Sequence, residues 1–257
     1  MTAPNDNNNL PHNSIAAELA STGYTLTTLN PSCSPRSVDA LRRSCYDLDS
    51  DPYSPRHRGF GRYVANPDSS LRDRLYEGYE ESSNAAVGDG VVRYFAPLEP
   101  LVRANAALRQ IIMDIVAIYR TATGTTGVIE IGLHQIRVHA AAHEPGEATP
   151  EKRHHDGNTA FGAVLLNRHC TGGETLIYDT DETLVEKHTM TQALDVVLCI
   201  DHRVSHEVTP ITPPPGSTTG FRDVLIVDLY DEDNIADVIN LNPNDSRPGT
   251  MRRPIYP

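Results

Sequence analysis

The sequence predicts a mainly β domain with flanking helices, in which N-terminal helices pack on an all-β barrel or a double-sheet jelly roll. After Gly124 the chain consists of short runs rich in Val, Ile, Leu and Thr, separated by clusters of Gly, Pro, Asp and Asn. Residues 101–119 carry the strongest amphipathic pattern and predict a helix that covers the sheet. The length of 257 residues suits one sizeable globular domain.

The first elements are predicted from helical spacing and alternation. Ile15 and Leu19, followed by Gly23, indicate an amphipathic helix that ends at the glycine, and alternation over residues 24–29 indicates a strand. Ser37 is expected to cap a second helix. The apolar positions of that helix recur at helical spacing: Val38, Leu41 and Cys45.

Residues 56–100 are polar and irregular, with short strands expected at 61–64 and 91–95. The β-rich part follows the long helix, and Gly172 and Gly173 are expected to form a hairpin turn with positive φ. Its expected strands are residues 128–140, 160–167, 174–178, 195–200, 207–211 and 223–229.

The charge balance excludes several classes of partner. Lys and Arg number 22 against 34 Asp and Glu, and a net charge of -12 argues against binding to nucleic acid or to a membrane surface.

The longest apolar stretch, residues 108–119, is too short to span a membrane. Residues 1–12 lack the pattern of a signal peptide, and four cysteines without a CxxC pair favour free thiols, so we expect a cytoplasmic protein.

Most of the 11 histidines lie between His134 and His206, and two of them are candidate metal ligands. On an extended strand, His154 and Asp156 share one face while His155 points away. His206, at the head of another expected strand, supplies a third ligand. Two imidazoles and one carboxylate that leave other coordination positions open are typical of non-haem Fe(II) oxygenases.

Three further residues are candidates for binding small molecules. Arg222 opens the strand after His206, and its guanidinium could clamp a dicarboxylate cosubstrate. Gln135 and Arg137 share a strand face. If that face points inward, both residues could bind the substrate, with Arg137 paired to the carboxylate of the substrate. A surface strand with a solvated arginine is the alternative.

Four ordered motifs resemble the 2-oxoglutarate and iron-dependent dioxygenase family that contains bacterial L-isoleucine 4-hydroxylase. The resemblance covers roughly residues 128–229 and departs from the family pattern at His155 and Glu207. The motifs are His154-His155-Asp156-Gly157, GGETLIY at 172–178, DHRVSHEVTPI at 201–211 and RDVLIVD at 222–228.

The resemblance implies a double-stranded β-helix, a distorted, cupin-like jelly roll, at residues 125–230 of a single oxygenase domain spanning 14–257. A helical and irregular part at 14–124 and a C-terminal extension at 231–257 would flank this core, after a disordered start at 1–13. It also implies Fe(II) bound at the positions of His154, Asp156 and His206, and 2-oxoglutarate at Arg222.

The implied reaction is hydroxylation by O2 of an unactivated C–H bond in a free, aliphatic L-amino acid, with release of succinate and CO2 and with ascorbate as support. Desaturation or oxidative ring closure on the same cofactors is an alternative that the ligands do not distinguish. A metal-dependent, non-redox hydrolase or isomerase and a catalytically silent binding module are alternatives of other classes. The oligomeric state is left open.

Overall fold

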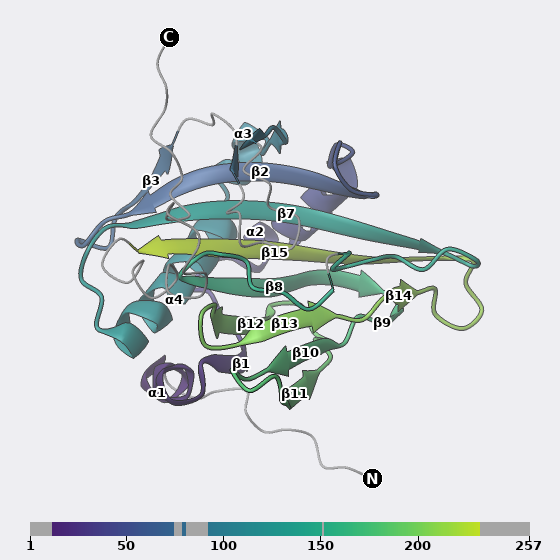
Figure 1. Cartoon of the computed structure of the whole chain (residues 1–257). Helices are drawn as coiled ribbons and strands as arrows, with labels where there is room; N and C mark the ends of the chain where they lie inside the picture. Colours follow the sequence, from purple (N-terminus) through teal and green to yellow (C-terminus); the bar gives the residue numbers. More distant parts are fainter. Residues whose placement is uncertain (1–11, 75–78, 81–91, 151, 232–257) are drawn as a thin grey trace.

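The computed structural model describes residues 12–74, 79–80, 92–150 and 152–231. Within them, a large antiparallel sheet has the strand order β1-β12-β8-β15-β7-β2-β3, and β6 pairs with β2 in parallel (Figure 1). These strands are β1 (Tyr24–Thr28), β12 (Asp195–Ile200), β8 (Ala160–His169), β15 (Thr219–Asp231), β7 (Ile129–Ala141), β2 (Arg56–Ala65), β3 (Leu71–Arg74) and β6 (Ala96–Pro97).

Smaller sheets complete a jelly roll. A three-stranded sheet has the order β11-β10-β13, and β14 pairs with β9 and β4 with β5. Ile177 and Ile211 of the small sheets pack with Phe161 and Val224 of the large one in one buried cluster. The predicted fold class is therefore confirmed. The bounds are β4 (Tyr79–Glu80), β5 (Val92–Arg93), β9 (Thr171–Gly172), β10 (Thr175–Tyr178), β11 (Leu184–His188), β13 (Ser205–Val208) and β14 (Ile211–Thr212).

The helices cover the opposite face of the large sheet, behind the strands in Figure 1. Leu108, Ile111 and Ile115 of the longest helix are fully buried in one cluster with Leu225 and Val227 of β15. Among the described residues, no helix has the length and apolarity that a membrane crossing requires. The helices are α1 (His12–Thr22), α2 (Pro35–Ser44), η1 (Cys45–Asp47), α3 (Pro100–Arg103) and α4 (Ala106–Thr123).

Alternation along β15 divides its side chains between the two faces of the sheet. Every second residue packs in the cluster under α4: Leu225, Val227 and Leu229. The residues between them line a cavity between the sheets: Arg222, Val224, Ile226 and Asp228. The strand therefore carries a structural face and a face that is open to ligands.

Two expected helix starts are wrong. Ser34, not Ser37, caps α2, because its Oγ accepts the backbone N–H of Ser37 at 3.2 Å and Pro35 begins the helix. The helix expected at 101–119 is two helices, since the Asn105 side chain caps a new helix, α4. A side-chain cap can end one helix and start the next while the apolar residues keep their helical spacing, so the spacing alone does not reveal the break.

Several expected strands have other bounds. The strand expected at 207–211 is divided between β13 and β14, with Pro210, which has no N–H to donate, between them. Gly172 and Gly173 have the positive φ expected of them, 71° and 70°, but the hairpin expected there is wrong, because β9 pairs with β14 and not with β10. The short strand expected at 61–64 is part of the longer β2, and the exposed strand β11 was not expected.

The ends of the chain are described only in part. Helix α1 begins at His12, before the expected domain start at residue 14. The disordered start expected at 1–13 otherwise lies outside the described residues, as does the C-terminal extension beyond residue 231.

Candidate metal centre and active site

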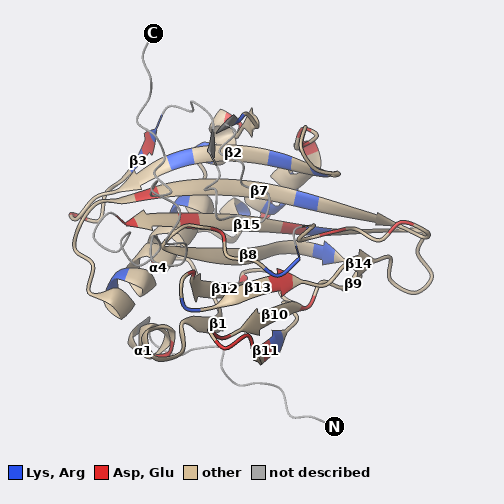
Figure 2. Ribbon diagram, viewed as in Figure 1, with Lys and Arg blue, Asp and Glu red and all other residues tan. Residues whose placement is uncertain are grey.

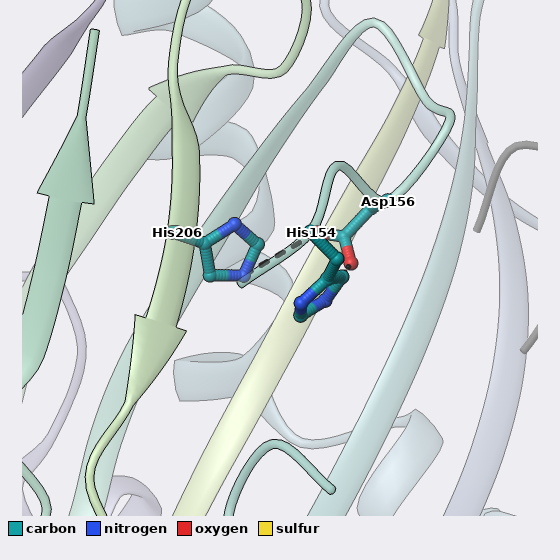
Figure 3. A group of neighbouring side chains, drawn as sticks. All are labelled: His154, Asp156 and His206. Atoms are coloured by element: carbon teal, nitrogen blue, oxygen red, sulfur yellow. Dashed lines mark hydrogen bonds and ion pairs between the residues drawn. The ribbon is translucent and has the colours of Figure 1, made fainter. Parts of the chain in front are cut away.

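The three predicted metal ligands converge between the two sheets (Figure 3). His206 lies on β13, and His154 and Asp156 lie in the segment before β8. That segment is not the strand that we expected, because only an isolated bridge joins His154 to His206. The two residues exchange backbone N–H···O bonds of 3.0 Å each way, which fixes both imidazoles at one place.

The side chains offer three ligand atoms that lie within 4.8 Å of one another. His154 Nε2 lies 3.1 Å from Asp156 Oδ1, and His206 Nε2 lies 3.9 Å from Asp156 Oδ2. The ring centroids of His206 and Phe161 are 4.3 Å apart, so an apolar ring supports the ligand that comes from the small sheet. This donor set of two nitrogens and one oxygen suits a divalent iron with open coordination positions.

The protonation states also suit a metal. Burial lowers the pKa of His206 to about 4, so its imidazole is neutral at pH 7 and offers a lone pair. Burial raises the pKa of Asp156, but His206 and a hydrogen bond from His154 outweigh this and hold that pKa below its usual range. The site therefore presents neutral imidazole and ionised carboxylate, which are the forms that bind metal.

Asp201, at the end of β12, positions Asp156. Its fully buried carboxylate accepts the backbone N–H groups of Asp156 and Gly157, both at 2.8 Å. Burial and then the charge of Asp156 raise the pKa of Asp201 to about 8, so the residue adds little negative charge at pH 7. Sequence analysis quoted Asp201 in a motif and considered it a salt-bridge partner of Arg203, which is wrong, because Asp201 is fully buried and Arg203 donates to the backbone oxygens of Ala20 and Ser21.

Arg222 lies in the same cavity as the triad and is only 4% exposed. Its guanidinium makes no hydrogen bond or ion pair with any described residue, and burial lowers its pKa to about 10. A cation held in this way is costly unless a ligand brings it an anion. The cavity thus offers a metal site and, apart from it, a site for a negative group.

A model of the family described as 2OG-Fe dioxygenase matches residues 42–228. The match covers more than half of the chain and includes the triad and Arg222. The chain belongs to the 2OG-Fe dioxygenase family. It is therefore a 2-oxoglutarate-dependent non-haem iron dioxygenase, and the family implies Fe(II), 2-oxoglutarate and O2 as its cofactor and cosubstrates.

Individual relatives are consistent with this membership. L-isoleucine-4-hydroxylase of Bacillus thuringiensis is 27% identical over 189 residues, which are 71% of this chain and 78% of that protein. The crystal structure of IDO from Bacillus thuringiensis has a TM-score of 0.74 at 21% identity and covers 90% of this chain and 99% of its own. A bsmA homologue from Methylobium petroleophilum has a TM-score of 0.77 at 21% identity, over 90% and 98% of the two chains.

Gln135 and Arg137 do not line the cavity of this 2OG-Fe dioxygenase. They face the helices, where Gln135 Nε2 donates to Ser44 Oγ at 2.8 Å. Arg137 donates to both oxygens of Asp223, at 2.6 and 2.7 Å. The side chains of Arg137 and Gln135 are buried as expected of an inward face, but it is the wrong face, and their predicted role in binding substrate is not supported by this geometry.

Three other charged residues and one histidine of the dioxygenase line the cavity, and sequence analysis missed them there: Arg56, Arg58, Asp228 and His134. The spacing of two residues between His134, Ile136 and Val138 in β7 could have placed His134 on the cavity face, since all three line the cavity. The two arginines lie in the stretch that we expected to be irregular. His155 is not part of the triad, and its Nδ1 lies 2.5 Å from the backbone oxygen of Asp201.

Proposed function

We propose that this dioxygenase hydroxylates an unactivated C–H bond of a free, aliphatic L-amino acid. In the reaction, O2 gives one oxygen atom to the substrate and one to 2-oxoglutarate, which loses CO2 and becomes succinate. His154, Asp156 and His206 would hold Fe(II), and Arg222 would bind the distal carboxylate of 2-oxoglutarate. A location in the cytoplasm is part of the proposal, and it is supported by four cysteines that are all free thiols.

The observation that carries the proposal is the buried, unpartnered Arg222 in the cavity of the triad. A guanidinium that no described carboxylate neutralises calls for an anionic ligand, and its planar fork suits a carboxylate. A metal hydrolase or isomerase that acts on an uncharged substrate would have no use for this second charge. A dicarboxylate that reaches from the triad to Arg222 would use both.

The residues of the chain supply binding, orientation and exclusion of water. When bound, the iron supplies the redox chemistry that activates O2. Phe161, Val224 and Ile226 line the cavity beside the polar groups, so the reacting C–H bond would be held away from bulk solvent. Asp201 keeps Asp156 in place through two backbone N–H bonds.

The substrate class is supported by the relative that is named for hydroxylating isoleucine and by the lining of the cavity. The space between protein atoms is about 870 Å³, a volume that includes the solvent in its open mouth. It is lined by apolar side chains and a few charged ones, as an aliphatic amino acid next to 2-oxoglutarate would need.

A screen for succinate release tests the proposal. The full chain is incubated with Fe(II), ascorbate, 2-oxoglutarate and each free amino acid in turn, and products are analysed by mass. A gain of one oxygen is expected for at least one aliphatic amino acid. A loss of two hydrogens would show desaturation or ring closure instead, and no amino-acid-dependent succinate from any of them would overturn the proposal.

A further inference from the structure

Two arginines share one carboxylate at the side of the metal cavity. Arg56 and Arg58 occupy cavity-facing positions of β2, a strand on which basic residues are visible in Figure 2. The Nε atoms of Arg56 and Arg58 lie 3.2 and 3.0 Å from the same atom, Asp51 Oδ2. The Asp51 side chain is fully buried, so this cluster is built into the protein rather than displayed on its surface.

The cluster has an excess of positive charge. Among the described residues, two guanidinium groups share one carboxylate, and Arg58 Nη1 also lies 3.3 Å from His134 Nδ1. Burial lowers the pKa of His134 to about 3, so the ring is neutral and does not change the count. Arg58 is only 5% exposed. A surplus cation at such a depth is stabilised when an anion enters the cavity.

This positive charge lies on β2, and β7 separates it from β15, the strand that carries Arg222. In the sheet register Arg56 is opposite Val138 of β7, which is opposite Arg222 of β15. Two strand spacings, about 10 Å, thus separate the backbones of the two arginines. The cavity therefore has one cationic position on β15 for the cosubstrate and a separate one on β2.

A negative group lies close to the β2 cluster. His134 Nε2 is 3.3 Å from Asp228 Oδ2, and Asp228 lines the same cavity. One imidazole ring thus separates a guanidinium from a carboxylate. An α-amino acid carries its carboxylate and ammonium groups on one carbon atom and could turn the first toward the guanidinium and the second toward Asp228, whereas a second dicarboxylate would meet the charge of Asp228.

We propose that Arg58, supported by Arg56, binds the α-carboxylate of the amino-acid substrate and makes the enzyme selective for free amino acids over their amides. The inference rests on the proposed function, because it names the recognition of that substrate. Phe95 lies against the guanidinium of Arg58, with Cζ 4.3 Å from the ring centroid, and fixes its plane. A guanidinium held in this way can receive a carboxylate with two parallel hydrogen bonds.

Titration calorimetry without O2 tests this recognition directly. The protein, loaded with Fe(II) and 2-oxoglutarate, is titrated with the best amino acid from the screen and with its carboxamide. We expect the wild-type protein to bind the acid roughly 10- to 100-fold more tightly than the amide. In Arg58→Gln the ratio should fall close to 1, and in Arg58→Lys, which keeps the charge but not the fork, to a value between.

Arg62→Gln is the matched control. Arg62 is a buried arginine of the same strand, is paired with Glu130 and does not line the cavity, so its replacement should leave the ratio unchanged. Because the ratio compares two ligands on one protein, a partly unfolded sample does not alter it. Arg58→Lys keeps a charge beside Asp51 should Arg58→Gln fail to fold.

Two results would overturn the inference alone: an amino acid that is hydroxylated but bound no better than its amide, or a ratio that survives Arg58→Gln. Affinity for 2-oxoglutarate, titrated separately, should be unchanged in Arg58→Gln, and a large loss there would assign the cluster to the cosubstrate. Failure of the succinate screen for every amino acid would overturn the proposed function, and this inference with it.

Discussion

Two buried arginines on opposite faces of the large sheet, Arg137 and Arg222, differ in how their charge is balanced. On the helix-covered face, Arg137 and Asp223 satisfy one another through two short hydrogen bonds. On the cavity face, Arg222 lies one residue from Asp223 and makes no hydrogen bond with any described residue. A charge paired within the protein supports the fold, whereas a charge without a protein partner marks a place for a ligand.

The same contrast separates two carboxylates, Asp223 and Asp156. Asp223 accepts hydrogen bonds from Arg137 and, at 2.8 Å, from Asn167 Nδ2. It does not line the cavity. Asp156 meets two histidines whose nitrogens lie close enough to hold one ion with it. Substitutions on the cavity face should therefore reduce activity at nearly constant stability, and substitutions on the helix face should do the reverse.

The largest effect is expected at the triad. His206→Ala removes one of three ligands and should lower amino-acid-dependent succinate release by more than about 100-fold, a loss at least as large as those of residues that only support metal ligands. The thermal midpoint of the metal-free protein should change little. His188→Ala, on the exposed strand β11 away from the cavity, is the control. A variant with normal turnover would remove His206 from the metal centre.

The helix face gives the next effect. Arg137→Gln leaves the fully buried Asp223 without its charged partner and should lower the free energy of unfolding by about 3–5 kcal/mol, measured by urea denaturation. The folded fraction should keep its affinity for 2-oxoglutarate. Arg203→Gln, which removes only bonds to Ala20 and Ser21 backbone oxygens, should cost far less. A stable Arg137→Gln with weakened substrate binding would place Arg137 in the active site after all.

Replacement of the cavity-face arginine should give the opposite result. Arg222→Gln should raise the KM for 2-oxoglutarate about 100-fold, because the distal carboxylate loses its charged partner. The free energy of unfolding should stay constant or rise, since a buried cation that no described residue neutralises has been removed. A marked loss of stability with unchanged KM would show that Arg222 is structural.

Sequence analysis selected the three candidate metal ligands that the structure brings together, because their order and spacing can be read without any knowledge of the fold. It failed on Arg137 because alternation tells which residues share a face, and not which face is covered by helices. That choice depends on where α2 and η1 pack, and Gln135 contacts Ser44 at their junction. Contacts of this kind join residues about ninety positions apart and leave no local pattern.

Arg56 and Arg58 were missed for a different reason. Their strand begins in a stretch rich in Arg, Gly and Pro, and polar composition indicates a loop when no partner strand is known. In the structure that stretch pairs with β7 as a strand of the large sheet, and its arginines line the cavity. The predicted cap of α2 was wrong for a similar reason. Several serines near the start of α2 fit the capping pattern, and only the folded geometry shows that Ser34 is the cap.

The smallest effect concerns the neutral histidine beside Arg58. Burial lowers the pKa of His134 to about 3, so folding favours its neutral form. The stability from this residue is fully present above the unfolded pKa of about 6.5 and is lost as the pH falls toward 3. His134→Gln cannot be protonated in this range, so between pH 7 and pH 4.5 the wild-type free energy of unfolding should fall about 2 kcal/mol further than that of the variant. Equal losses in urea denaturation at the two pH values would mean that His134 is protonated in the folded protein, and the charge excess of the Arg56–Arg58 cluster would then be larger still.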